Sequence, residues 1–145
     1  MASEYKPNLG VNEITAATTL TRDAYAGRTT VLNSTTGRIV TLPAATGTGA
    51  TYTIVIAATV SSGSHVIRVA SSSDIIQGTI AIATDIAGVT VPTAVDTDTI
   101  TMNGSTTGGV RGSLIELQDI ATGIFAVRGS LVSTGVEATP FSAAV

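Results

Sequence analysis

The stretch from Asp23 to Gly78 alternates short runs of β-branched residues with clusters of Gly, Ser, Thr and Asn. β-Branched side chains pack well on a pleated sheet, whereas the residues of the clusters tolerate the backbone angles of tight turns. Strands are therefore predicted for the runs TTVLN, RIVTLP, TYTIVIA and HVIRVA, with turns between them. This pattern indicates a compact all-β domain.

The same pattern continues along the chain and predicts about ten short strands, spaced by roughly 8 to 12 residues. Such spacing predicts a single antiparallel β-sandwich or jelly-roll-like barrel, with extended N- and C-terminal arms. No repeat of about 20 to 50 residues is visible, which disfavours solenoids and propellers. We assign residues 1–22 to an N-terminal arm and first strand, 23–134 to the β domain and 135–145 to a C-terminal tail.

Two turn sequences predict hairpins. Asn33 to Gly37 is expected to reverse the chain, with Gly37 at positive φ. Asn103-Gly104 is the strongest short-range hairpin signal in the chain. Near the N-terminus, Asn12 to Arg22 predicts a first strand, and a short helix is the alternative because of Ala16-Ala17.

Charged residues make up 12% of the chain, about half the share of a typical soluble domain. The net charge of −3 argues against binding of nucleic acid through a basic face. No apolar run approaches the roughly 18 to 20 residues that span a bilayer, and the N-terminus lacks the hydrophobic segment of a secretory signal. Because 43% of the residues are nevertheless hydrophobic, we expect the chain to bury surface against other chains.

The sequence contains few candidates for chemistry. His65 is the single histidine, and Ser64 points to the other face of a strand, so the two cannot pair. Asp96 and Asp98 share a strand face and could bind Ca²⁺ or form an acid pair. No further calcium ligands follow at the required spacing, and a solvated strand start is the favoured interpretation. Gly47-Thr48-Gly49 lacks the Lys-Ser/Thr ending of a phosphate loop and predicts a flexible loop. The chain has no cysteine. We predict no catalytic residue, no cofactor, no metal site and no enzymatic activity.

The terminal segments contain residues that are unusual in a solvated tail: Tyr5, Pro7, Leu9 and Phe141. A frayed N-terminus is the alternative, since chain ends are commonly disordered. We predict that these four residues contact a partner.

A series of turn and strand motifs follows Asp23, namely Ala26-Gly27-Arg28, Asn33 to Gly37, Thr41 to Gly49, and Tyr52 in the strand after them. In these motifs the chain, between Asp23 and Phe141, resembles structural proteins of tailed bacteriophages. The resemblance implies a capsid decoration (cement) protein, a class that is small, β-rich and usually trimeric. Such proteins sit on the outside of the head and clamp neighbouring subunits of the major capsid protein.

The partners implied by the resemblance are two further copies of the chain and the major capsid protein, with no nucleic acid and no membrane. The implied location is the capsid exterior of the virion, after synthesis in the host cytoplasm. The alternative is a receptor-facing β module of a tail fibre, spike or head fibre, which binds the host surface. Such a module normally accompanies a β-helical or coiled stem, and the sequence predicts neither.

Overall fold

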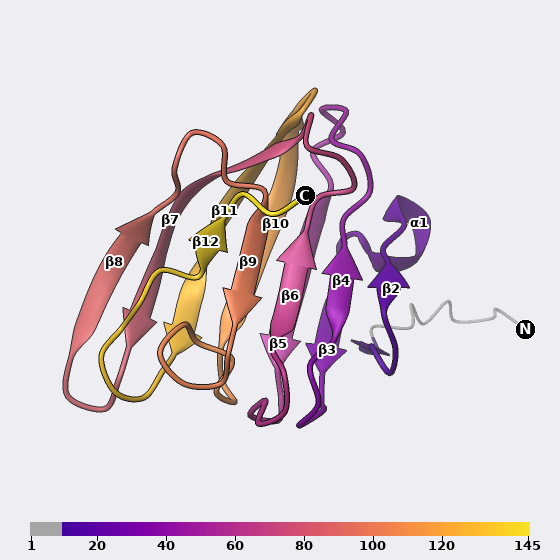
Figure 1. Ribbon diagram of the computed structural model, residues 1–145. Coiled ribbons are helices and arrows are strands. Elements are labelled where there is room, and N and C mark those ends of the chain that lie inside the picture. Colours follow the sequence, from indigo (N-terminus) through magenta and orange to yellow (C-terminus); the bar gives the residue numbers. More distant parts are fainter. Residues whose placement is uncertain (1–9) are drawn as a thin grey trace, which may run out of the picture.

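The computed structural model describes residues 10–145, which form two β-sheets packed face to face (Figure 1). The seven-stranded sheet contains, in spatial order, β1 (Asn12–Glu13), β3 (Thr29–Leu32), β5 (Thr51–Ile56), β10 (Leu114–Ala121), β11 (Ile124–Val132), β7 (Ile75–Ala83) and β8 (Gly88–Pro92). The five-stranded sheet contains β12 (Phe141–Ser142), β9 (Thr99–Met102), β6 (His65–Arg68), β4 (Ile39–Thr41) and β2 (Thr18–Thr19). The predicted all-β class is confirmed.

The core lies between the two sheets and follows from the alternation of side chains along each strand. In β5, Tyr52, Ile54 and Ile56 are buried, while the residues between them are half-buried on the outer face. Phe125 of β11 is the second large aromatic residue of the core. Each such side chain contributes about 1.5 to 3 kcal/mol when it is fully buried, so the inward faces of the strands carry most of the stability.

The N-terminal half winds back and forth between the sheets. Strands β1, β3 and β5 are successive neighbours in one sheet, strands β2, β4 and β6 in the other, and every pairing among them is parallel. This is the local arrangement of a two-sided β-solenoid. One full coil of the winding leads from Asn12 to its neighbour Thr30 in the next strand. The following coil leads from Thr29 to Thr53, so the two coils differ in length. Because the period is not constant, no repeat is visible in the sequence.

The C-terminal half is mainly antiparallel. Strand β10 pairs antiparallel with both β5 and β11, and β7 pairs antiparallel with β8, whereas β11 and β7 are parallel. In the other sheet, β9 pairs antiparallel with β6 and β12. The prediction of antiparallel sheets is therefore wrong for five strand pairings of the described residues. The twelve strands of residues 10–145 form two mixed sheets, and these do not close into a barrel.

Neither predicted hairpin pairs the strands on its two sides. Strands β3 and β4 flank Asn33 to Gly37 but belong to different sheets, and the same holds for β9 and β10 around Asn103-Gly104. Both segments are turns that carry the chain across the sandwich. Gly37 does not have a positive φ; a Cβ at this position would collide with the backbone oxygen of Ser64. The glycine is needed because two segments of backbone approach each other closely there.

Both ends of the described chain join the sandwich. In residues 10–22 the strands β1 and β2 each form the edge of a sheet, and the short helix α1 (Arg22–Tyr25) follows. No helix in the described region is long and apolar enough to cross a membrane. At the other end β12 pairs with β9, so the C-terminal tail packs on its own domain and does not extend from it as an arm.

We expect Gly37→Ala to destabilise the fold more than Gly27→Ala. Gly27 has φ of +70°, and a Cβ at this position would meet no heavy atom within 4 Å, so alanine there costs about 1 to 2 kcal/mol of backbone strain. At Gly37 the clash with Ser64 forces the backbone apart, and we expect a loss of about 3 kcal/mol. Urea unfolding of the two variants measures the difference; equal losses would contradict the close approach.

Candidate interaction surfaces

Only one of the four predicted partner contacts lies in the described part of the chain. Tyr5, Pro7 and Leu9 lie outside the described residues. Phe141 begins β12, opposite Ile100 of β9, and its half-buried side chain packs against the core. Phe141 therefore has a role within its own domain, and its contact with a partner stays a prediction.

The C-terminal residues are held by Asp98, which is 4% exposed. Its carboxylate accepts hydrogen bonds from the N–H of Ala144 at 2.8 Å, the N–H of Val145 at 3.3 Å and the hydroxyl of Thr99 at 2.7 Å. Burial alone would raise the pKa of Asp98, but these bonds outweigh it and hold the pKa below its usual value. Asp96 remains exposed. The interpretation of both residues as a solvated strand start is thus wrong for Asp98.

A second buried carboxylate, Asp119 at the end of β10, organises the Gly-rich loop of residues 45–50. It accepts hydrogen bonds from the N–H groups of Thr46 at 3.1 Å, Gly47 at 2.7 Å and Thr48 at 3.1 Å, and from the Thr48 hydroxyl at 2.7 Å. Burial would raise the pKa of Asp119, but the hydrogen bonds lower it further than burial raises it. The loop does form a cradle for an anion, and that anion is the chain's own carboxylate. The prediction of a flexible loop is wrong, because these contacts fix it.

A third buried acid, Asp74, accepts a hydrogen bond from the N–H of Ala45 at 3.0 Å. Asp74 and Asp119 therefore anchor adjacent residues of one loop. Asp74, Asp98 and Asp119 all accept hydrogen bonds from backbone N–H groups. The described region contains no group of three or more side chains that could bind a metal ion. Sequence reasoning missed these anchors. The signal was present, since Asp119 continues the inward-facing series of Ile115 and Leu117.

His65 is fully buried at the start of β6. Its Nδ1 accepts a hydrogen bond from the N–H of Arg38 at 3.1 Å. A nitrogen that accepts carries no proton, so the imidazole ring is neutral. Burial lowers the pKa of His65; the carbonyl of Ser34 opposes this shift and the charge of Arg38 adds to it. His65 is thus a packed structural residue, one of the two roles that sequence reasoning favoured over catalysis.

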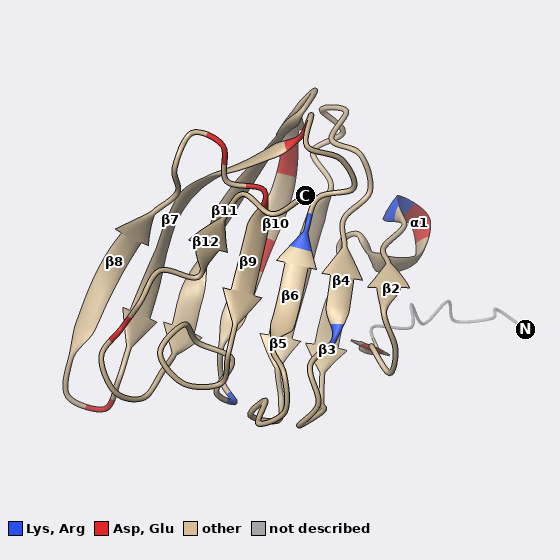
Figure 2. Ribbon diagram, in the orientation of Figure 1, with Lys and Arg blue, Asp and Glu red and all other residues tan. Residues whose placement is uncertain are grey.

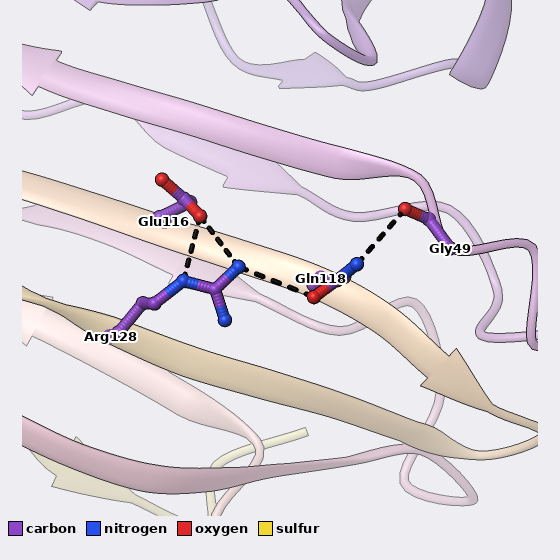
Figure 3. A network of polar contacts seen from close by, with 4 residues as sticks. All are labelled: Gly49, Glu116, Gln118 and Arg128. Atoms are coloured by element: carbon purple, nitrogen blue, oxygen red, sulfur yellow. Dashed lines mark hydrogen bonds and ion pairs between the residues drawn. The ribbon is translucent and has the colours of Figure 1, made fainter.

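The outer face of the seven-stranded sheet is broad and almost free of charge. We call the outward side chains of β3, β5, β10, β11 and β7 the broad face; most of them are Thr, Ala, Val, Ser or Gln. Figure 2 shows how few charged residues these strands carry. At the centre, Arg128 forms an ion pair with Glu116 at 2.6 Å and donates to the Gln118 side chain at 3.2 Å (Figure 3). The two charges neutralise each other, so the face has no strong field.

The Gln118 side chain continues this network and donates to the carbonyl of Gly49 at 3.3 Å. Because the Arg128 and Glu116 side chains are 52% and 31% exposed, the ion pair contributes at most about 1 kcal/mol. A hollow of about 320 Å³ is lined by Ile75, Gln77, Thr93, Ala94 and Val95, from β7 and the segment after β8, and none of these residues is charged. The described side chains of this region are thus uncharged apart from the Arg128–Glu116 pair.

Comparison with protein-family models, with curated proteins and with solved structures gives no match to this chain. A proposal of function therefore depends on the surfaces described above and on the resemblance of the sequence motifs.

We expect Asp119→Asn to destabilise the protein by about 2 to 3 kcal/mol at pH 7, because an amide cannot accept all the bonds that converge on a carboxylate. The pKa of Asp119 is lower in the folded than in the unfolded state. Its stabilising contribution is therefore present above about pH 4 and is lost as the pH falls through the folded pKa.

Urea unfolding between pH 7 and pH 2 measures both effects. The exposed Asp96→Asn is the control and is expected to leave stability within about 0.5 kcal/mol. An Asp119→Asn protein as stable as the wild type at pH 7 would show that the cradle does not hold the loop.

We expect the wild-type protein to lose stability as the pH falls below about 6.5, the usual pKa of histidine. Folding lowers the pKa of His65, so the folded state binds the proton at a lower pH than the unfolded state does. The contribution of the neutral ring to stability is therefore lost as the pH falls through the folded pKa. His65→Asn retains an acceptor near Nδ1 and has no group that titrates in this range. The variant is expected to be less stable than the wild type, with a stability that does not change between pH 7 and pH 5. If its stability fell with pH as steeply as that of the wild type, His65 would not be the group responsible.

Proposed function

We propose that this chain is a capsid decoration protein of a tailed bacteriophage, acting as a homotrimer on the outside of the head. Its partner is the major capsid protein, and its location is the exterior of the virion. Binding to the assembled shell and not to free subunits stabilises the shell by mass action, and many copies add their effects. The proposal includes no catalytic step.

The broad face is the observation that carries this proposal. Five adjacent strands of up to nine residues present a surface of roughly 600 Å² at ordinary strand spacing. This approaches the roughly 800 Å² that each partner contributes to a standard protein interface. The face is nearly neutral and built from small side chains, which suits close contact with a protein shell better than contact with nucleic acid.

The motifs that carry the resemblance build the winding of the N-terminal half. Gly27 has positive φ just before β3, Gly37 allows the close approach to Ser64, and Gly47 belongs to the loop around Asp119. These motifs therefore define a fold and not a reactive site. A resemblance of this kind supports a structural role.

The alternative, a receptor-facing module of a fibre or spike, is favoured by one observation. The parallel winding of β1 to β6 is the local arrangement of a β-helical stem. The two functions differ in what the protein binds, namely expanded phage heads or host cells. Co-sedimentation of the purified protein with each of these targets separates them.

We expect the protein to have the mass of three chains in solution and to co-sediment with expanded heads that lack it. Ala126→Lys places a charge in the broad face, and we expect it to weaken binding at least about tenfold, because an unpaired charge is desolvated at the interface. The matched control is Val66→Lys, on the outer face of the five-stranded sheet and half-buried to a similar degree.

Two results would contradict the proposal. Binding to host cells without binding to heads would support the fibre module. If Ala126→Lys bound expanded heads as well as the wild type does, the broad face would not be the surface that contacts the shell.

A further inference from the structure

The hollow between β7 and the segment after β8 has a fixed shape. The N–H of Thr93 donates to the carbonyl of Gly78 at 3.0 Å, and the Thr93 hydroxyl accepts the N–H of Gly78 at 3.1 Å. The hydroxyl of Thr97 accepts the N–H of Ala94 at 2.9 Å, and its carbonyl accepts the N–H of Ile76 at 2.7 Å. These four bonds hold the segment against β7. The hollow is therefore formed before a partner arrives, which lowers the entropic cost of binding.

The lining of the hollow combines apolar walls with one side-chain amide. Three of its five residues are apolar, namely Ile75, Ala94 and Val95, and Val95 is 92% exposed. The Gln77 side chain is exposed and has no hydrogen-bond partner within residues 10–145. Its amide offers an acceptor oxygen and N–H donors, which are the two functions of a peptide group. The volume of about 320 Å³ is near the lower end of the range for ligand pockets, so it suits one side chain and its adjoining backbone.

The hollow is continuous with the broad face. In the pairing of β11 with β7, Ile75 lies beside Ile124 and Gln77 lies beside Ala126. Ile75 and Gln77 are outward residues of β7 and so belong to the broad face. Arg128 follows Ala126 by two residues and points to the same side of β11. Arg128 and Gln77 are thus one strand and two residues apart on one surface.

The guanidinium of Arg128 is held in place, yet one of its nitrogens is not used. Its Nε donates to Glu116 at 2.7 Å and its Nη2 donates to Gln118 at 3.2 Å. The third nitrogen, Nη1, points away from both partners in Figure 3 and has no hydrogen-bond acceptor in the described part of the chain. Because Glu116 already neutralises the charge of Arg128, a neutral carbonyl oxygen suits Nη1 better than a second carboxylate. A donor that is already fixed loses little side-chain entropy on binding.

We propose that Arg128 and the hollow together bind an extended peptide segment, with one apolar side chain of the segment inside the hollow. The backbone of the segment pairs with the amide of Gln77, and one of its carbonyl oxygens accepts a hydrogen bond from Nη1 of Arg128. Arg128 and the hollow are separated by about two strand spacings, roughly 10 Å, which an extended segment of about four residues spans.

The surface on which the hollow lies indicates the source of the segment. This step rests on the proposed function, in which the broad face contacts the major capsid protein. A segment of that protein lies over β11 and β7 in the bound state, so its backbone is the one within reach of Gln77 and Arg128. An apolar side chain that fills a pocket is a common anchor of protein interfaces, and the contacts around it mainly exclude water. The hollow is therefore the position of the strongest contact between this chain and the shell.

Filling the hollow tests the anchor. Ala94→Trp places a large side chain in the lining, and we expect it to weaken binding to expanded heads at least about tenfold. Ala87→Trp is the matched control, because Ala87 is also exposed and lies near the other end of β8. We expect this control to bind like the wild type. Urea unfolding of both variants is expected to match that of the wild type, since neither alanine is buried.

Two further substitutions test the polar contacts. Gln77→Met keeps an unbranched side chain but removes the amide, and Arg128→Lys keeps the charge beside Glu116 but removes the fork of donors. We expect each to weaken binding to expanded heads about fivefold, through the loss of hydrogen bonds to the segment. The double variant Gln77→Met/Ala94→Trp is expected to bind no more weakly than Ala94→Trp alone. A segment that cannot enter the hollow no longer reaches Gln77, so the two effects do not add.

A capped peptide provides a readout that does not depend on phage heads. The probe is acetyl-Ala-Leu-Ala-Ala-amide at millimolar concentration, and acetyl-Ala-Asp-Ala-Ala-amide is its control. We expect the leucine peptide to shift the NMR resonances of the Gln77 side-chain amide and of the Val95 methyl groups. The aspartate peptide is expected to leave both unchanged, because its charge would be desolvated between apolar walls.

The outcomes separate this inference from the proposed function. Binding of Ala94→Trp to heads as tightly as the wild type, or equal shifts from the two peptides, would overturn the peptide site and leave the proposed function intact. Shifts from the leucine peptide alone, without binding of the wild type to heads, would overturn the proposed function and the shell as the source, while the peptide site would stand. A fall in the mass of Ala94→Trp from three chains to one would identify a neighbouring copy as the source and overturn the shell as the occupant.

Discussion

The carboxylate of Asp119 holds together the two halves of the molecule. It lies at the end of β10, the strand that joins the parallel winding of the N-terminal half to the antiparallel C-terminal half. The loop that it binds connects β4 of one sheet to β5 of the other, and β5 is the neighbour of β10. The carboxylate therefore ties this loop to the sheet that contains β5 and β10. A buried charge is tolerated there because backbone donors surround it. The neighbouring contact of Asp74 with Ala45 fixes the start of the same loop.

The face and the edge of the seven-stranded sheet differ in the groups that they expose. The broad face presents side chains of low charge around a neutralised ion pair, whereas the edge of β8 presents backbone groups in a fixed register. A side-chain surface gives contact area, and a strand edge gives hydrogen bonds with a defined orientation.

Several strands, β5 among them, could be predicted from the sequence, but their partners could not. The alternation in β5 is visible in the sequence because it is a local property, and it correctly separates Tyr52 and Ile54 from Thr53. The turn at Asn103-Gly104 is also local, yet the strand that follows it belongs to the other sheet. Turn residues specify a change of direction and not the sheet in which the chain continues. The same limit applies to the candidate site, since an acid such as Asp119 acquires its role only through a loop distant in the sequence.

The position of β10 also determines the order in which the protein can fold. Strand β5 is complete at Ile56, but its neighbour on the open side begins only at Leu114. During synthesis, the parallel winding therefore has an unpaired, apolar strand edge until β10 has emerged. Pairings between segments so distant in the sequence form slowly, because the chain between them must first be ordered. The consequence is an interval in which the nascent chain is more prone to association than the finished domain, with β5 as the exposed strand.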